Sequence, residues 1–165
     1  MLKRIRRKKL GFAGGAFAIV ASKYNAKYVN GMLRAALAEL KQAGAPAPVV
    51  VRVPGAYEIP VVAARLAAAK SGDTGAPQFA AIICLGVILR GETAHADLIA
   101  EAITHGLTRI QLDHGVPVIH EVLLLDNEQQ AKVRCLSREH NRGREAAQTA
   151  LQIAQTLASL SAAGN

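Results

Sequence analysis

The chain has 165 residues, of which 51% are hydrophobic, 19% are charged and 4% are aromatic. This length and composition exclude an intrinsically disordered chain and favour one domain with its own hydrophobic core. The low aromatic content, with no Trp, argues against a protein that stacks nucleic-acid bases on aromatic side chains. No apolar run reaches the roughly 18 residues of a membrane span, so no membrane association is expected.

The net charge of +8 is concentrated at the N-terminus. Six of the 20 Lys and Arg residues lie within residues 1–9, which leaves 14 basic and 12 acidic residues in the rest of the chain. We therefore expect a basic, mobile tail over residues 1–9 and a single near-neutral domain over residues 10–165. Repeated on an oligomer, such a tail would attract RNA or other polyanions in a salt-dependent manner; a solvated tail without a partner is the alternative.

The two cysteines, Cys84 and Cys135, lie far apart and match no zinc or redox spacing. Reduced thiols in a cytoplasmic protein are therefore expected, and neither cysteine has a neighbour that would activate it as a nucleophile. No metal site is expected either, because no ligand spacing links His105, His114, His120 and His140.

The stretch Leu10–Ala21 allows two interpretations, because an apolar segment after a basic one also describes a secretory signal peptide. Its glycines, Gly11, Gly14 and Gly15, weaken the helix that a signal peptide requires. The segment Ala16–Ser22 (AFAIVAS) instead has the pattern of a buried strand. We interpret it as the first strand of the domain.

Apolar runs typical of buried strands alternate with segments of helical periodicity along the whole chain. In chain order, the sequence predicts a strand at Ala16–Ala21, a helix at Ala26–Ala43 that Gly44 ends, a strand at Pro46–Val53, a helix at Ile59–Lys70, a loop at Ser71–Pro77, a strand at Ala80–Leu89, a helix at Thr93–Leu112, a strand at Pro117–Leu125 and helix from Asn127 onward with a break near Asn141–Gly143. This alternation predicts a three-layer αβα sandwich around a four-stranded, mostly parallel, doubly wound sheet of the flavodoxin-like type.

Ligands of such folds bind at the carboxyl ends of the strands. The segments that follow the predicted strands are Ser22–Asn25, Pro54–Glu58, Arg90–His95 and Asp126–Asn127, and most of the reactive side chains of the chain lie in them. A purely structural protein gives no reason for this clustering.

The segment Arg90–His95 (RGETAH) lies between a buried strand and a helix. Gly91 allows a close backbone approach, Thr93 suits a helix N-cap, and the free N–H groups of the first turn would bind a phosphate or another anion beside His95. An ordinary capped turn is the alternative.

The segment Val53–Pro60 (VPGAYEIP) is a rigid turn between two prolines. The ring of Tyr57 and the carboxylate of Glu58 would suit a polar, ring-bearing ligand, unless Glu58 only helps to cap the next helix. The same alternatives apply to Tyr24 and Asn25, which follow the first strand.

Several short sequence pieces can be compared with known families: IVASKYN (Ile19–Asn25), VPGAYEIP (Val53–Pro60), LGVILRGETAH with a following Asp (Leu85–Asp97), GVPVI (Gly115–Ile119), DNEQQA (Asp126–Ala131) and NRG (Asn141–Gly143). In this order they resemble the lumazine synthase family of riboflavin biosynthesis, from about Phe17 to the C-terminus. The resemblance implies condensation of 5-amino-6-ribitylaminouracil with 3,4-dihydroxy-2-butanone 4-phosphate, without a metal or a redox cofactor.

Matched residue by residue, the resemblance implies proton transfer by His95 and phosphate binding by Arg134. Gly91, Glu92 and Thr93 match the phosphate loop. The other implied substrate-binding positions are Tyr24 and Asn25 at the pyrimidine, Ala56, Tyr57 and Glu58 at the ribityl chain, Ile88 and Leu89 beside the ring, and His120 from a neighbouring subunit. From its helical position alone, Arg134 would be interpreted as solvated or ion-paired.

Several positions depart from the usual pattern of the family. Glu92 places a carboxylate where the phosphate loop usually has a small neutral residue, so only its backbone is expected to help. His120 stands where the family commonly has a Phe, and Leu124 and Leu125 stand where Thr is common.

The resemblance also implies a homo-oligomer, since family members form pentamers with sites between subunits and some assemble into icosahedral shells. The turn at Ser137–Gly143 has no insertion that would block a shell, so we expect the shell rather than the free pentamer. One alternative is an archaeal-type riboflavin synthase, against which the phosphate set of Thr93 and Arg134 argues. The other is a polyanion-binding shell protein, against which the near-neutral body and scarce aromatics argue.

Overall fold

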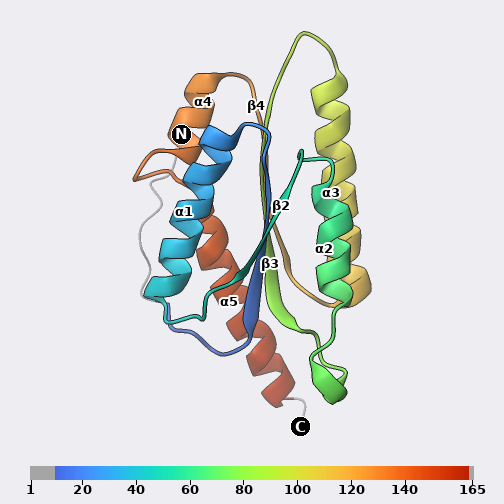
Figure 1. The fold of residues 1–165 in the computed structure, drawn as a ribbon. Coiled ribbons are helices and arrows are strands. Elements are labelled where there is room, and N and C mark those ends of the chain that lie inside the picture. Colours follow the sequence, from blue (N-terminus) through green and yellow to red (C-terminus); the bar gives the residue numbers. More distant parts are fainter. Residues whose placement is uncertain (1–9, 164–165) are drawn as a thin grey trace.

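Four parallel strands form the central sheet of the computed structural model, which describes residues 10–163 (Figure 1). The strands are β1 (Ala16–Ser22), β2 (Val49–Val53), β3 (Phe79–Leu89) and β4 (Val118–Leu125), and they lie in the order β2-β1-β3-β4. Each neighbouring pair is parallel, which confirms the predicted sheet. The predicted basic tail, residues 1–9, lies outside the described residues.

Helices cover both faces of the sheet and make the predicted three layers (Figure 1). One face carries α1 (Ala26–Gln42), α4 (Glu128–Cys135) and α5 (Arg142–Ala163), and the other carries α2 (Ile59–Ala68) and α3 (His95–His114). The chain runs from β1 outward to β2 and then returns past β1 to β3. The strand order therefore reverses between β1 and β3, the point at which open α/β sheets bind ligands.

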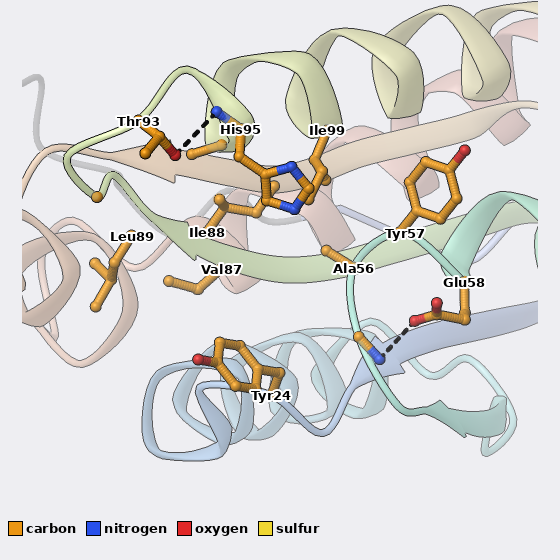
Figure 2. Close-up of a pocket in the computed structure, with 13 residues that line it drawn as sticks. Tyr24, Ala56, Tyr57, Glu58, Val87, Ile88, Leu89, Thr93, His95 and Ile99 are labelled. Carbon is orange, nitrogen blue, oxygen red and sulfur yellow. Dashed lines mark hydrogen bonds between the residues drawn. The ribbon is translucent and has the colours of Figure 1, made fainter.

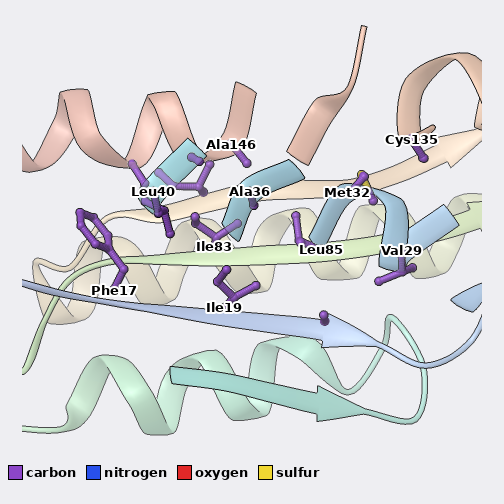
Figure 3. Packing of buried hydrophobic residues seen from close by; sticks show 14 of the residues in the cluster. Phe17, Ile19, Val29, Met32, Ala36, Leu40, Ile83, Leu85, Cys135 and Ala146 are labelled. Carbon is purple, nitrogen blue, oxygen red and sulfur yellow. The ribbon is translucent and has the colours of Figure 1, made fainter. Parts of the chain in front are cut away.

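Alternation along β1 divides the core into two clusters. Phe17 and Ile19 face α1 and α5, whereas Ala18 and Val20 face α2, and each of the four side chains is at most 1% exposed. Strands buried on both faces have nearly continuous apolar sequences, as the predicted strands do. In Figure 3, α1 residues lie over the β1 and β3 side chains; the α1 residues are Val29, Met32, Ala36 and Leu40, and the strand residues are Ile19, Ile83 and Leu85.

Most predicted boundaries differ from the structure by one to three residues, and three of these differences have a bearing on the fold and the site. Strand β2 begins at Val49 instead of Pro46, because Pro46 and Pro48 have no N–H group for the sheet. Helix α3 begins two residues later than predicted. The break in the C-terminal helical region spans residues 136–141, and the buried Asn141 ends it by accepting a 2.9 Å hydrogen bond from the Gly143 N–H.

The stretch that resembled a signal peptide contains β1, which confirms its interpretation as a strand of the domain. Both cysteines are buried and free. Burial raises the pKa of each thiol, to about 12 for Cys135, which disfavours a thiolate nucleophile. Within residues 10–163, no helix is long and apolar enough to cross a membrane, and no group of three or more His, Cys, Asp or Glu side chains is placed to hold a metal.

Candidate functional site

A cavity of about 420 Å³ opens at the carboxyl ends of β1 and β3 (Figure 2). It lies where the strand order reverses, as the fold class predicts. Three segments far apart in the sequence line it: Tyr24, then Gly55, Ala56, Tyr57 and Glu58, and finally the stretch from the end of β3 into α3, with Val87, Ile88, Leu89, Gly91, Thr93, His95, Ala96 and Ile99.

Most of the predicted site residues belong to this lining. The predicted residues outside it are Asn25, Glu92, His120 and Arg134. The strand ends therefore meet as expected.

Tyr24 lies on a tightly held turn between β1 and α1. The backbone N–H groups of Lys23 and Tyr24 donate to the carbonyls of Val53 and Pro54, at 2.7 and 3.0 Å, and so extend the ladder between β1 and β2. Asn25 has a left-handed backbone (φ 55°), and its Nδ2 donates to the Val87 carbonyl of β3 at 2.8 Å. The Asn25 amide thus holds the turn in place, while the Tyr24 ring remains 73% exposed at the cavity.

Arg52 supports the same turn, and the sequence analysis did not single it out. Its guanidinium donates to the carbonyls of Ala21 and Ser22, at 3.2 and 2.9 Å, and to Asn30 Oδ1 at 2.7 Å. These acceptors belong to the end of β1 and to α1. A lone arginine within the apolar strand VVVRV was the available signal, since a charge there needs buried acceptors.

We predict that Arg52→Ala lowers the free energy of unfolding by about 2–4 kcal/mol, because three part-buried acceptors lose a charged donor. Arg52→Lys should recover part of this loss. Urea denaturation measures the effect, and Arg65→Ala, at an exposed position on α2, is the matched control. An Arg52→Ala curve that coincides with the wild-type curve would contradict a stabilising role for these three hydrogen bonds.

The turn between β2 and α2 is closed by its own carboxylate. Glu58 Oε2 accepts from the Gly55 N–H at 2.9 Å (Figure 2). Glu58 occupies the N-cap position of α2, but its side chain makes no capping hydrogen bond to that helix. Tyr57, 62% exposed, projects from this turn at the rim of the cavity, and Ala56 faces into it.

The segment after β3 brings the N-terminus of α3 to the cavity. Helix α3 begins at His95 with Ala94 at its N-cap, so the predicted N-cap at Thr93 is wrong by one residue. Ala94 already has helical dihedral angles, and the Thr93 hydroxyl accepts instead from the His95 N–H at 3.4 Å. The positive end of the α3 dipole, the Thr93 hydroxyl and the His95 ring therefore border one space (Figure 2).

His120 and Arg134 do not reach the cavity of their own chain. Arg134 lies on α4, which covers the other face of the sheet. His120 lies on the edge strand β4, where its Nε2 is 2.9 Å from Thr104 Oγ1 and its Nδ1 accepts from the Val122 N–H at 3.2 Å. Desolvation lowers the pKa of His120, which favours its neutral form.

A second charged group that the sequence analysis missed is Glu121, in the middle of β4. Its carboxylate is buried and accepts from Arg142 Nε at 3.0 Å, and Arg142 also pairs with Glu145. Burial raises the pKa of Glu121 to about 7, despite the opposing attraction of Arg142. An acidic residue within the apolar run PVIHEVLLL was the available signal.

We predict a pH-dependent contribution of Glu121 to stability. The pKa of this group is 4.5 in an unperturbed chain and about 7 in the fold, so the folded state binds more protons between these values. The contribution is therefore complete below pH 4.5 and is lost as the pH rises through 7. The free energy of unfolding of wild type relative to Glu121→Gln should fall by on the order of 3 kcal/mol across this range.

Chemical denaturation at a series of pH values measures this difference, and the subtraction cancels the titration of His120 in both proteins. Glu101→Gln, at an exposed position on α3, should show no such slope. Parallel curves for wild type and Glu121→Gln would contradict the raised pKa of Glu121.

Comparison with known proteins gives one consistent result. The family profile for 6,7-dimethyl-8-ribityllumazine synthase matches residues 14–158. The chain is 38% identical over 157 residues to the 6,7-dimethyl-8-ribityllumazine synthase of Renibacterium salmoninarum, which covers 90% of this chain and 93% of the relative. It is also 41% identical to the enzyme of that name from Stenotrophomonas maltophilia, in an alignment that covers 87% of this chain and 90% of the relative. The identity to the enzyme of that name from Frankia casuarinae is again 41%, in an alignment that covers 92% of this chain and 91% of the relative.

Proposed function

The chain belongs to the 6,7-dimethyl-8-ribityllumazine synthase family, and from this membership we propose that the cavity at the ends of β1 and β3 is its active site. The reaction is the condensation of 5-amino-6-ribitylaminouracil with 3,4-dihydroxy-2-butanone 4-phosphate, which releases phosphate and water in the penultimate step of riboflavin biosynthesis. The observation that carries the proposal is the meeting of Tyr24, Tyr57, Thr93 and His95 around one cavity.

The apolar part of the cavity suits the pyrimidine. Ile88 and Leu89 form a wall at the end of β3, and the exposed Tyr24 ring is available to stack on a flat heterocycle. The polar turn of Ala56, Tyr57 and Glu58 stands on another side, where backbone groups and the Glu58 carboxylate can bind the hydroxyls of a ribityl chain.

The phosphate is proposed to bind at the first turn of α3. Gly91 and Thr93 line the cavity there, and the unpaired N–H groups of a helix N-terminus favour an anion. His95 then stands between the phosphate and the ring. Imine formation and phosphate expulsion require proton transfers near neutral pH, for which imidazole is well suited.

Arg134 and His120 are proposed to come from a second copy of the chain. Tyr24 and Tyr57 are 73% and 62% exposed beside a cavity open to solvent, which leaves room for a neighbouring subunit to complete it. We propose a cyclic pentamer, with pentamers assembled into an icosahedral shell. Light scattering and electron microscopy distinguish a shell from a free pentamer, and a fully active monomer would contradict the shared site.

Incubation of the protein with both substrates tests the reaction most simply. A fluorescent lumazine and inorganic phosphate should appear in equal amounts, and omission of either substrate should abolish both. The archaeal-type riboflavin synthase alternative predicts instead that lumazine alone is converted to riboflavin. That outcome, without phosphate release from the two precursors, would replace the proposed function.

The location and the basic N-terminus form the last part of the proposal. Two free, buried thiols support a cytoplasmic protein.

We predict that deletion of residues 2–9 leaves catalysis intact and abolishes nucleic acid that copurifies at low salt, since six basic residues are removed. The ratio of absorbance at 260 and 280 nm across a salt series measures this. Loss of activity would assign a structural role to the tail, and persistent nucleic acid would place the binding surface elsewhere.

A further inference from the structure

Arg90 joins two carboxylates next to the proposed phosphate loop. Its Nη1 lies 2.7 Å from Asp97 Oδ1, and its Nε lies 3.1 Å from Asp126 Oδ1. Asp97 belongs to the first turn of α3, and Asp126 directly follows β4. Arg90 itself does not line the cavity, although Gly91 beside it does.

The position of Asp97 creates an electrostatic conflict. A carboxylate in the first turn of a helix interacts favourably with the positive helix end, the same feature that would attract the phosphate. Glu92 adds another negative charge within the loop. An unpaired Asp97 would therefore repel a phosphate monoester, and the guanidinium of Arg90 offsets this charge.

The same arginine also anchors the loop. Its backbone N–H donates to the Leu125 carbonyl at 2.8 Å, so the chain stays joined to β4 until the loop begins. Asp126 is in turn fixed by two hydrogen bonds with Gln130 of α4, each 3.0 Å long. Arg90 thus connects the first turn of α3 to Asp126, which Gln130 holds in place.

We propose that Arg90 is a positioning residue for phosphate, which acts by pairing with Asp97 and not by touching the ligand. This inference rests on the proposed function and deepens it, since it assigns to Arg90 the neutralisation of the Asp97 charge beside the proposed phosphate site. It predicts a specific rescue: removal of Arg90 is harmful only while Asp97 keeps its charge.

The experiment compares wild type, Arg90→Gln, Arg90→Lys, Asp97→Asn and the double variant Arg90→Gln with Asp97→Asn. The dissociation constant of inorganic phosphate is measured by calorimetry, and KM and kcat are measured for each substrate. We expect Arg90→Gln to weaken phosphate binding and to raise KM for the phosphorylated substrate about fivefold, less at high salt. The KM for the pyrimidine substrate and kcat should stay within about twofold of wild type, because Asp97 acts through charge alone.

The double variant should recover most of the phosphate affinity, and Arg90→Lys should retain it. Arg109→Gln is the matched control, because Arg109 forms a similar pair with Asp113 at the far end of the same helix, at 3.2 Å. Unrecovered affinity in the double variant would mean that Arg90 touches the phosphate. Wild-type affinity in Arg90→Gln, or an equal rise in both KM values, would also overturn the inference. Calorimetry measures phosphate binding without turnover, so failure of the proposed reaction is distinguishable from failure of the inference about Arg90.

Discussion

His95→Ala should lower kcat by about 100- to 10,000-fold, the usual contribution of a positioned general acid or base. His95 is the first residue of α3, and its imidazole faces the cavity beside Ile88 and Ile99 (Figure 2). The reaction cannot proceed without proton transfer to and from the amine, the carbonyl and the departing phosphate. Because the side chain is exposed, its removal should leave the unfolding curve unchanged, so the loss reports catalysis and not folding.

Steady-state kinetics with both substrates measure this loss. His105→Ala is the matched control, since His105 lies on the same helix, is 79% exposed and pairs only weakly with Glu101 at 3.7 Å. A His95→Ala enzyme with wild-type kcat would remove His95 from the proposed chemistry and leave it as an incidental residue of a helix terminus.

Arg134→Ala should lower kcat/KM for the phosphorylated substrate by about 10- to 100-fold, which corresponds to the loss of a charge-assisted hydrogen bond to phosphate. The KM for the pyrimidine substrate should change little. The expected effect is large because a planar guanidinium can bind two phosphate oxygens at once. Arg134→Lys should recover the charge without this geometry, and therefore only part of the loss.

Lys132→Ala tests whether any basic residue of α4 has this effect, since Lys132 is exposed on the same helix. Equal losses for both substrates, or equal losses in the Lys132→Ala variant, would contradict a specific phosphate contact by Arg134. Competition by inorganic phosphate gives an independent measurement, because the Arg134→Ala enzyme should be inhibited much less than wild type.

The cavity was predictable because its parts are local in sequence. Each turn, from Tyr24 through Ala56–Glu58 to Gly91–His95, is recognisable from its own residues and from the strand before it. A parallel sheet then brings the carboxyl ends of all strands to one edge. Neither step requires knowledge of side-chain packing, which explains why the fold class and the turns around the cavity were predicted together.

The supporting contacts were not predictable, because they depend on the register between distant strands. The side-chain amide of Asn25 donates a hydrogen bond to the carbonyl of Val87, 62 residues later in the chain, and Arg52 donates to carbonyls at the end of the neighbouring strand β1. The pairing of Glu121 with Arg142 likewise needs the placement of α5 on β4. An isolated charge in an apolar strand signals that a partner exists, but only the fold identifies it.

The sequence did not predict which face of the sheet α4 covers either. This placement of α4 keeps Arg134 away from the cavity of its own chain. The resemblance to the family implies that Arg134 binds phosphate, whereas the fold places Arg134 on the face of the sheet that α4 covers. A second subunit reconciles the two, and that shared site is the central claim of the proposed function.

Subunit mixing tests this claim most directly. His95→Ala and Arg134→Ala chains, each strongly impaired alone when the phosphorylated substrate is kept below its KM, are unfolded, mixed in equal amounts and refolded into joint assemblies. If one subunit supplies His95 and the next supplies Arg134, random mixing leaves about a quarter of the sites with both residues, and lumazine formation should return to about a quarter of the wild-type rate. Activity no greater than that of the two parent variants would contradict a site built from two subunits.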